Sequence, residues 1–150
     1  MPGGSKLLQD ERYTRLSRPE LLYRLLIHIP LATALPEELI FRGALFGAWS
    51  QETGSRTAML GSSVAFGLWH IGPAIDRLRA NRPGATYRER AAAIAGTIAG
   101  TTLAGTCLSL LRIRSKGLAG PIVVHWAVNA LTTVGARSTT RTPHGRGAHA

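Results

Sequence analysis

The 150-residue chain has little cysteine, few aromatic residues and few acidic ones. Its single cysteine, Cys107, excludes an intrachain disulfide, and no CxxC or zinc-knuckle spacing is present. Only 8 Asp and Glu residues stand against 18 Lys and Arg, which gives a formal net charge of +10. The first 20 residues contain no apolar core, so they do not resemble a cleavable signal peptide. This length predicts one basic domain that no disulfide framework stabilises.

Long stretches of the chain also lack charge, and they indicate the environment in which it folds. A helix that crosses a bilayer needs about 20 predominantly apolar residues. Three stretches contain no Asp, Glu, Lys or Arg: residues 57–75, 91–111 and 117–136. Together with a helical region from residue 20 to about residue 50, they predict an all-α protein. We expect a polytopic transmembrane helical bundle with about four membrane helices.

Proline and glycine predict where these helices bend, end and pack. Pro30 and Pro36 should bend or locally break the first helix, because each removes a backbone donor. Gly72-Pro73 should end the second helix, ahead of a polar loop at residues 76–90. In the third helix, small residues every four positions predict close packing against another helix: Ala92, Gly96, Gly100 and Ala104.

The chain divides by composition into a basic N-terminal tail at residues 1–19, a helical core at residues 20–135 and a disordered basic tail at residues 136–150. With four spans, 13 basic residues fall on one side of the membrane and four on the other. Basic loops favour the cytoplasm, so we expect a multi-pass protein of the cell membrane with both termini cytoplasmic. This distribution explains the net charge by topology and anionic lipid headgroups, and no nucleic acid is expected as a partner.

Polar side chains inside the apolar segments are the candidate functional residues, because ionisable groups in a membrane are costly and usually functional. Glu38 and Arg42 are four residues apart on one helical face and can form an ion pair. Glu37 is rotated by about 100° from Glu38 and remains free for another partner. A carboxylate without a local cation in a dry site suits a general base that acts on water.

Two further motifs place histidines at helical spacing. Phe66 and His70 share one face, and His70 near Glu37 could hold a water molecule. His125 and Asn129 also share a face and could direct two hydrogen-bond donors at a developing oxyanion. A metal site is the competing hypothesis, since Glu37, His70 and His125 are suitable zinc ligands with water in the fourth position. No HExxH motif is present, so these residues alone do not decide between the two.

The ordered motifs EExxxR, FxxxH and HxxxN resemble those of the CAAX protease and bacteriocin-processing family, also called the ABI family, which includes type II CAAX prenyl endopeptidases. The surrounding segments ALPEELIFRGALFG and SSVAFGLWHIG are similar to that family as well. The resemblance covers about residues 30–134 and implies an intramembrane endopeptidase. The family is commonly labelled metalloprotease, and zinc is the cofactor if a metal is bound. We prefer water activated by glutamate, with no firm metal.

The resemblance also implies a role for each residue. Glu37 activates the water, and His70 helps to hold it. His125 and Asn129 stabilise the oxyanion. The supporting residues are Glu38, Arg42 and Phe66.

The expected function is hydrolysis of a peptide bond near the cytoplasmic face, in a peptide or protein substrate within the membrane. Members of the family usually carry additional helices before the glutamate motif. The expectation therefore includes a homo-oligomer or a partner that supplies the missing helices. The alternative function is that of a non-catalytic or truncated membrane protein of the same fold, such as a scaffold or a bacteriocin self-immunity factor.

Overall fold

The computed structural model describes residues 16–138, so most of both predicted tails lies outside the described residues. Within this range all regular secondary structure is helical, which confirms the all-α prediction. The first helical run extends from residue 18 to residue 53 and consists of five consecutive segments: α3 (Arg18–Tyr23), η1 (Arg24–Ala34), α4 (Leu35–Glu38), η2 (Leu39–Leu45) and α5 (Phe46–Thr53).

The first run begins at a capping box and passes through its prolines without losing helical dihedral angles. The Ser17 backbone N–H donates to the Glu20 carboxylate at 2.7 Å, and the Ser17 hydroxyl accepts from the Glu20 N–H at 3.4 Å. Segments η1 and η2 are π-helical, and the Leu35 N–H reaches back five residues to the carbonyl of Pro30. The expected proline break therefore takes the form of widened π-helical turns. Gly54, at φ 79°, ends the run.

The second predicted helix is longer than expected. It comprises α6 (Ser55–Trp69) and α7 (Ile71–Asn81), which join at His70. Gly72-Pro73 does not end it, and most of the predicted loop at 76–90 is helical, so both predictions are wrong. Pro73 is the third residue of α7, where a backbone N–H has no partner within its own helix, and a proline there costs no hydrogen bond.

Two long helices complete the described chain, α8 (Tyr87–Ser115) and α9 (Ala119–Ser138). Lys116 ends α8 in the left-handed conformation, at φ 53°. The predicted packing stripe on α8 is wrong, because a Cβ atom at Gly96 or Gly100 would meet no atom within 4 Å. The glycine of α8 that does pack closely is Gly105, five residues further along the helix.

Two helical stretches of the described chain are long and apolar enough to cross a membrane, Ser55–Asn81 and Tyr87–Ser115. Only 17% of the most apolar window in α8 is buried, so its side chains face outward, as in a lipid-exposed helix rather than a core helix of a soluble protein. The first run and α9 are helical, as expected for the other two spans, but they do not meet the same test. Both contain polar residues of the candidate site, which reduce their hydropathy.

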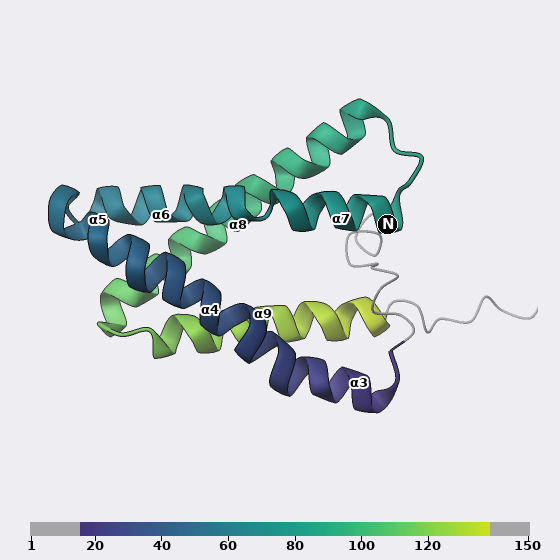
Figure 1. Cartoon of the computed structure of the whole chain (residues 1–150), viewed down its shortest axis with the longest axis horizontal. Helices are drawn as coiled ribbons and strands as arrows, with labels where there is room; N and C mark the ends of the chain where they lie inside the picture. The colour runs from purple at the N-terminus through teal and green to yellow at the C-terminus, as the bar shows by residue number, and fades with distance from the viewer. Residues whose placement is uncertain (1–15, 139–150) are drawn as a thin grey trace, which may run out of the picture.

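The helices form two packed groups that meet near the middle of the molecule. In Figure 1, α8 crosses α6, and α9 lies alongside the early part of the first run, consistent with the contacts between α6 and α8 and between α9 and η1. Segments α4 and η2 contact helices of both groups, since α4 touches α9 while η2 touches α6 and α8. The candidate residues of the first run lie in these two segments.

Candidate active site

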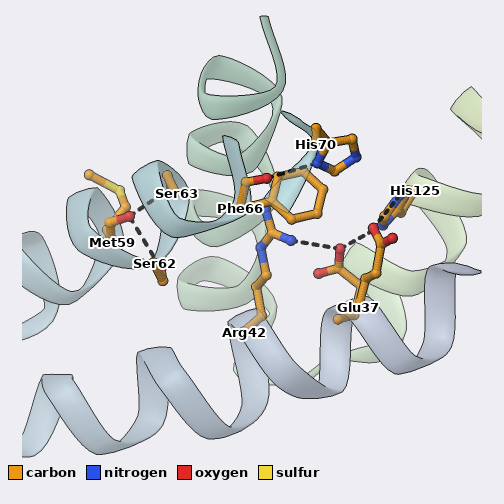
Figure 2. A network of polar contacts seen from close by, with 9 residues as sticks. Glu37, Arg42, Met59, Ser62, Ser63, Phe66, His70 and His125 are labelled. Atoms are coloured by element: carbon orange, nitrogen blue, oxygen red, sulfur yellow. Dashed lines mark hydrogen bonds and ion pairs between the residues drawn. The ribbon is translucent and has the colours of Figure 1, made fainter. Parts of the chain in front are cut away.

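A buried ion pair lies at the centre of the site. Glu38, the last residue of α4, is fully buried, and its Oε1 atom accepts hydrogen bonds from Arg42 Nη1 at 3.0 Å and from His125 Nδ1 at 2.8 Å. Arg42 is also fully buried. The two donors offset part of the cost of removing the Glu38 carboxylate from water. Glu38 therefore joins the first run to α9. Figure 2 shows the two donors, Arg42 and His125, on either side of this contact.

The contact with Glu38 determines which nitrogen of His125 carries a proton. An ionised carboxylate only accepts, so Nδ1 must be the donor. The other ring nitrogen, Nε2, lies 3.7 Å from Oε2 of Glu37. That oxygen is buried and has no hydrogen-bond partner, although the Glu37 side chain as a whole is 15% exposed. Glu37 and the His125 ring thus face each other across a gap slightly longer than a hydrogen bond.

Phe66 lies between the two candidate histidines. The ring of His70 meets it edge-on with centroids 4.6 Å apart, and the ring of His125 does so at 5.7 Å. The guanidinium carbon of Arg42 is 4.1 Å from the centroid of the Phe66 ring, a cation–π contact that also shields the ion pair. Phe66 therefore contacts the cation of the site as well as both imidazoles.

His70 is close to the site but is not bonded to Glu37. Its Nδ1 donates to the carbonyl of Phe66 at 2.8 Å, so Nε2 is the ring nitrogen that remains for another partner. In Figure 2 the ring lies above the Glu37–His125 pair, with no interaction drawn between them. His70 thus lies near Glu37, as expected for a residue that helps to hold a water molecule, but the two side chains are not in direct contact.

Asn129 is the candidate residue that the structure does not join to the others. Its backbone carbonyl accepts from the hydroxyls of Thr132 at 2.9 Å and Thr133 at 2.8 Å, whereas its side-chain amide makes no hydrogen bond in the described part of the chain. His125, one turn earlier, points its Nδ1 at Glu38. No hydrogen bond between His125 and Asn129 therefore aligns them as the expected pair of oxyanion donors.

Close helix packing around the ion pair depends on a glycine that the sequence analysis did not select. A Cβ atom at Gly105 would lie 2.9 Å from Arg42 Nη2, 3.1 Å from Phe66 Cδ1 and 3.3 Å from the Cα atom of Ser63. Gly105 directly follows the last residue of the predicted small-residue stripe, but it lies on a different face of α8. Its one sequence signal is the pair of glycines at 100 and 105 in the same apolar helix.

The candidate metal ligands do not form a metal site in this arrangement. Among the described residues, no group of three or more His, Cys, Asp or Glu side chains is placed to hold an ion. His70 and His125 each engage Nδ1 with an oxygen acceptor, which leaves Nε2 of each ring as the atom that could bind a metal. As placed, however, Glu37, His70 and His125 are not gathered around one point, so the structure does not bring the predicted zinc ligands together.

The fold and the site define a class, an all-helical membrane-type protein with a buried glutamate–arginine ion pair and a second, partly exposed glutamate that faces a histidine. The family model for Rce1-like type II CAAX prenyl endopeptidases matches residues 19–131, and the chain belongs to this family. The suspected relationship is confirmed, and at the level of the family it indicates a CAAX protease-type intramembrane peptidase. The family and the two apolar helices together indicate a membrane protein. No curated protein and no solved structure gives a significant match.

Proposed function

We propose that this chain is an intramembrane endopeptidase in which Glu37 activates a water molecule for attack on a peptide bond. The observation that carries the proposal is the Oε2 atom of Glu37, which is buried, unpartnered and 3.7 Å from His125 Nε2. A carboxylate oxygen with no competing donor is ready to accept a proton from the attacking water and to pass it to the leaving nitrogen when the peptide C–N bond breaks. Glu38 also has a buried oxygen without a partner, Oε2, but its Oε1 accepts hydrogen bonds from Arg42 and His125, which makes the whole carboxylate a weaker base.

The contacts of the cluster suggest how the remaining residues assist. Nδ1 of His125 contacts Glu38, which holds the ring with Nε2 toward Glu37. When Nε2 carries a proton, it is a donor that can stabilise the oxyanion formed when water attacks. Arg42 donates to the same Glu38 oxygen and so helps to hold that carboxylate in its buried position.

His70 and Asn129 have the less direct roles in this proposal. His70 Nε2 can accept a hydrogen bond from the attacking water, because its Nδ1 proton is engaged with the Phe66 carbonyl. Asn129 supplies a second oxyanion donor when substrate is bound, since its amide makes no other hydrogen bond in the described chain. The cleaved bond lies near the cytoplasmic face, and both termini are cytoplasmic, as the distribution of basic residues suggests.

The test is proteolysis by the purified protein in lipid nanodiscs against a library of membrane-anchored peptides, with products identified by mass spectrometry. Glu37→Gln keeps the shape of the side chain but lowers its basicity, and it should abolish detectable cleavage, since a general base contributes about 10²–10⁴ in rate. Glu52→Gln is the matched control, because Glu52 is an exposed acid at the end of α5.

Three results are distinguishable. Cleavage by the native chain that is lost in Glu37→Gln and retained in Glu52→Gln supports the proposal. Full activity in folded Glu37→Gln rules out the assigned base. No cleavage of any peptide by a folded native chain would favour the non-catalytic alternative.

A further inference from the structure

One side-chain hydrogen bond outside the ion-pair cluster joins α9 to the first helical run. The indole Nε1 of Trp126 donates to the backbone carbonyl of Leu25 at 2.7 Å. Leu25 lies in η1, and Trp126 lies in α9 next to His125. The bond therefore spans 101 residues of sequence and ties α9 to the helical run that carries both glutamates.

The carbonyl of Leu25 is available to the indole because of the proline five residues later. In a π-helix each carbonyl accepts from the N–H five residues further along. For Leu25 that position is Pro30, which has no N–H. The Leu25 carbonyl therefore lacks its π-helical donor, and it accepts a hydrogen bond from the Trp126 indole instead.

Trp126 and His125 project from α9 in directions about 100° apart, so they reach different parts of the first run. Trp126 contacts η1 at Leu25, whereas His125 contacts the end of α4 at Glu38. Two attachment points along one helix pair fix both the rotation and the axial position of α9. With one point alone, α9 could turn or slide about the remaining contact.

We propose that Trp126 is a positioning residue whose hydrogen bond to the Leu25 carbonyl sets the register of α9, so that His125 reaches Glu37 and Glu38 at the same time. The catalytic consequence rests on the proposed function, whereas the structural consequence does not. The position of the His125 ring can vary little, because one nitrogen lies 2.8 Å from Glu38 and the other lies 3.7 Å from Glu37. A misplacement of about 1 Å can cost about 10²-fold in rate.

The experiment uses the full chain in nanodiscs with ¹⁵N-labelled histidine and tryptophan. In the native chain the His125 Nδ1 proton should give a downfield signal typical of a hydrogen bond to carboxylate. Trp126→Phe keeps an aromatic ring but removes the donor, so it should abolish or shift that signal. It should also lower kcat by about 10²-fold with a smaller effect on KM. The matched control is Trp49→Phe, which removes an indole that packs on Gly61 and should leave the His125 signal in place.

A second variant separates positioning from fold stability. Pro30→Ala in the Trp126→Phe background adds a backbone N–H at position 30, which can serve the Leu25 carbonyl from within its own helix. This double variant should regain the melting temperature lost in Trp126→Phe without regaining the native His125 signal or kcat. If Trp126→Phe alone does not fold, the His125 signal and kcat are measured in the double variant instead.

Two results would overturn the inference. The first is an unchanged His125 signal in Trp126→Phe. The second is a double variant that recovers the His125 signal together with stability, because Trp126 would then act on the fold alone. A displaced His125 signal in Trp126→Phe, combined with full proteolysis by Glu37→Gln, would preserve the positioning role and reject the proposed function.

Discussion

Replacing Gly105 with alanine tests whether the ion pair is as tightly enclosed as the structure indicates. The added Cβ would come within 2.9 Å of Arg42 Nη2 and within 3.3 Å of the Ser63 Cα atom. The Ser63 backbone belongs to α6 and cannot move alone, so the guanidinium must shift. Arg42 is fully buried and bonded to Glu38 at 3.0 Å, so this shift strains the ion pair.

Gly100→Ala on the same helix is the matched control, because its Cβ would meet nothing within 4 Å. Both substitutions gain about the same helix propensity, roughly 1 kcal/mol. The difference between the two variants therefore isolates the overpacking, which typically costs about 1–3 kcal/mol. Gly100→Ala should be as stable as the native chain or more so, and Gly105→Ala should be less stable than Gly100→Ala by that amount.

The assay is thermal unfolding in a mild detergent, followed by tryptophan fluorescence at a fixed scan rate. For a chain of this size, 1 kcal/mol corresponds to about 2–4 °C in melting temperature. Gly105→Ala should therefore melt about 2–12 °C below Gly100→Ala. Equal melting temperatures for the two variants would refute the enclosed packing around Arg42.

The remaining predictions concern the ion pair, the oxyanion site and the topology. Arg42→Met should lower the free energy of unfolding by about 3–5 kcal/mol in denaturant titration, because Glu38 stays buried without its cation, and adding Glu38→Gln should recover part of this loss. Asn129→Ala should lower kcat by about 10²–10³ with little change in KM, and an unchanged kcat would remove Asn129 from the mechanism. In a chain lacking the exposed Cys107, cysteines introduced at positions 5 and 145 should resist labelling from outside intact cells, whereas efficient labelling of both would reverse the topology.

The parts of the site that the sequence predicted are those determined within a single helix. Glu38 and Arg42 form the expected pair, and Glu37 is turned away from Arg42 toward a different partner, because helical spacing alone decides both. The pairing of His125 with Glu38 depends on how α9 packs against the first run, and no local pattern encodes that packing. For the same reason the sequence did not predict the side of α8 that packs inward.

The fold was predicted in class but less well in its boundaries. The apolar stretches predicted helices, and the described chain is helical throughout its regular structure. Gly72-Pro73 was misinterpreted as a helix end, since a proline that ends one helix and a proline in the first turn of the next have the same local sequence. The expected break at Pro30 takes the form of a π-helix. The N–H that proline lacks is missing there from a ladder of hydrogen bonds that already differs from that of an α-helix.

The two π-helical segments on either side of α4 affect how this chain tolerates insertions and deletions. A π-helical turn holds about one residue more than an α-helical turn. A one-residue deletion within η1 can therefore be absorbed by a return to α-helical winding, which leaves the glutamates facing α9 and largely preserves the phase of α3. Inside α4 the winding is already α-helical, so the same deletion could not be absorbed and would rotate the glutamates by about 100°. Homologous sequences should accordingly align with single-residue gaps at residues 24–34 or 39–45, and without gaps at residues 35–38.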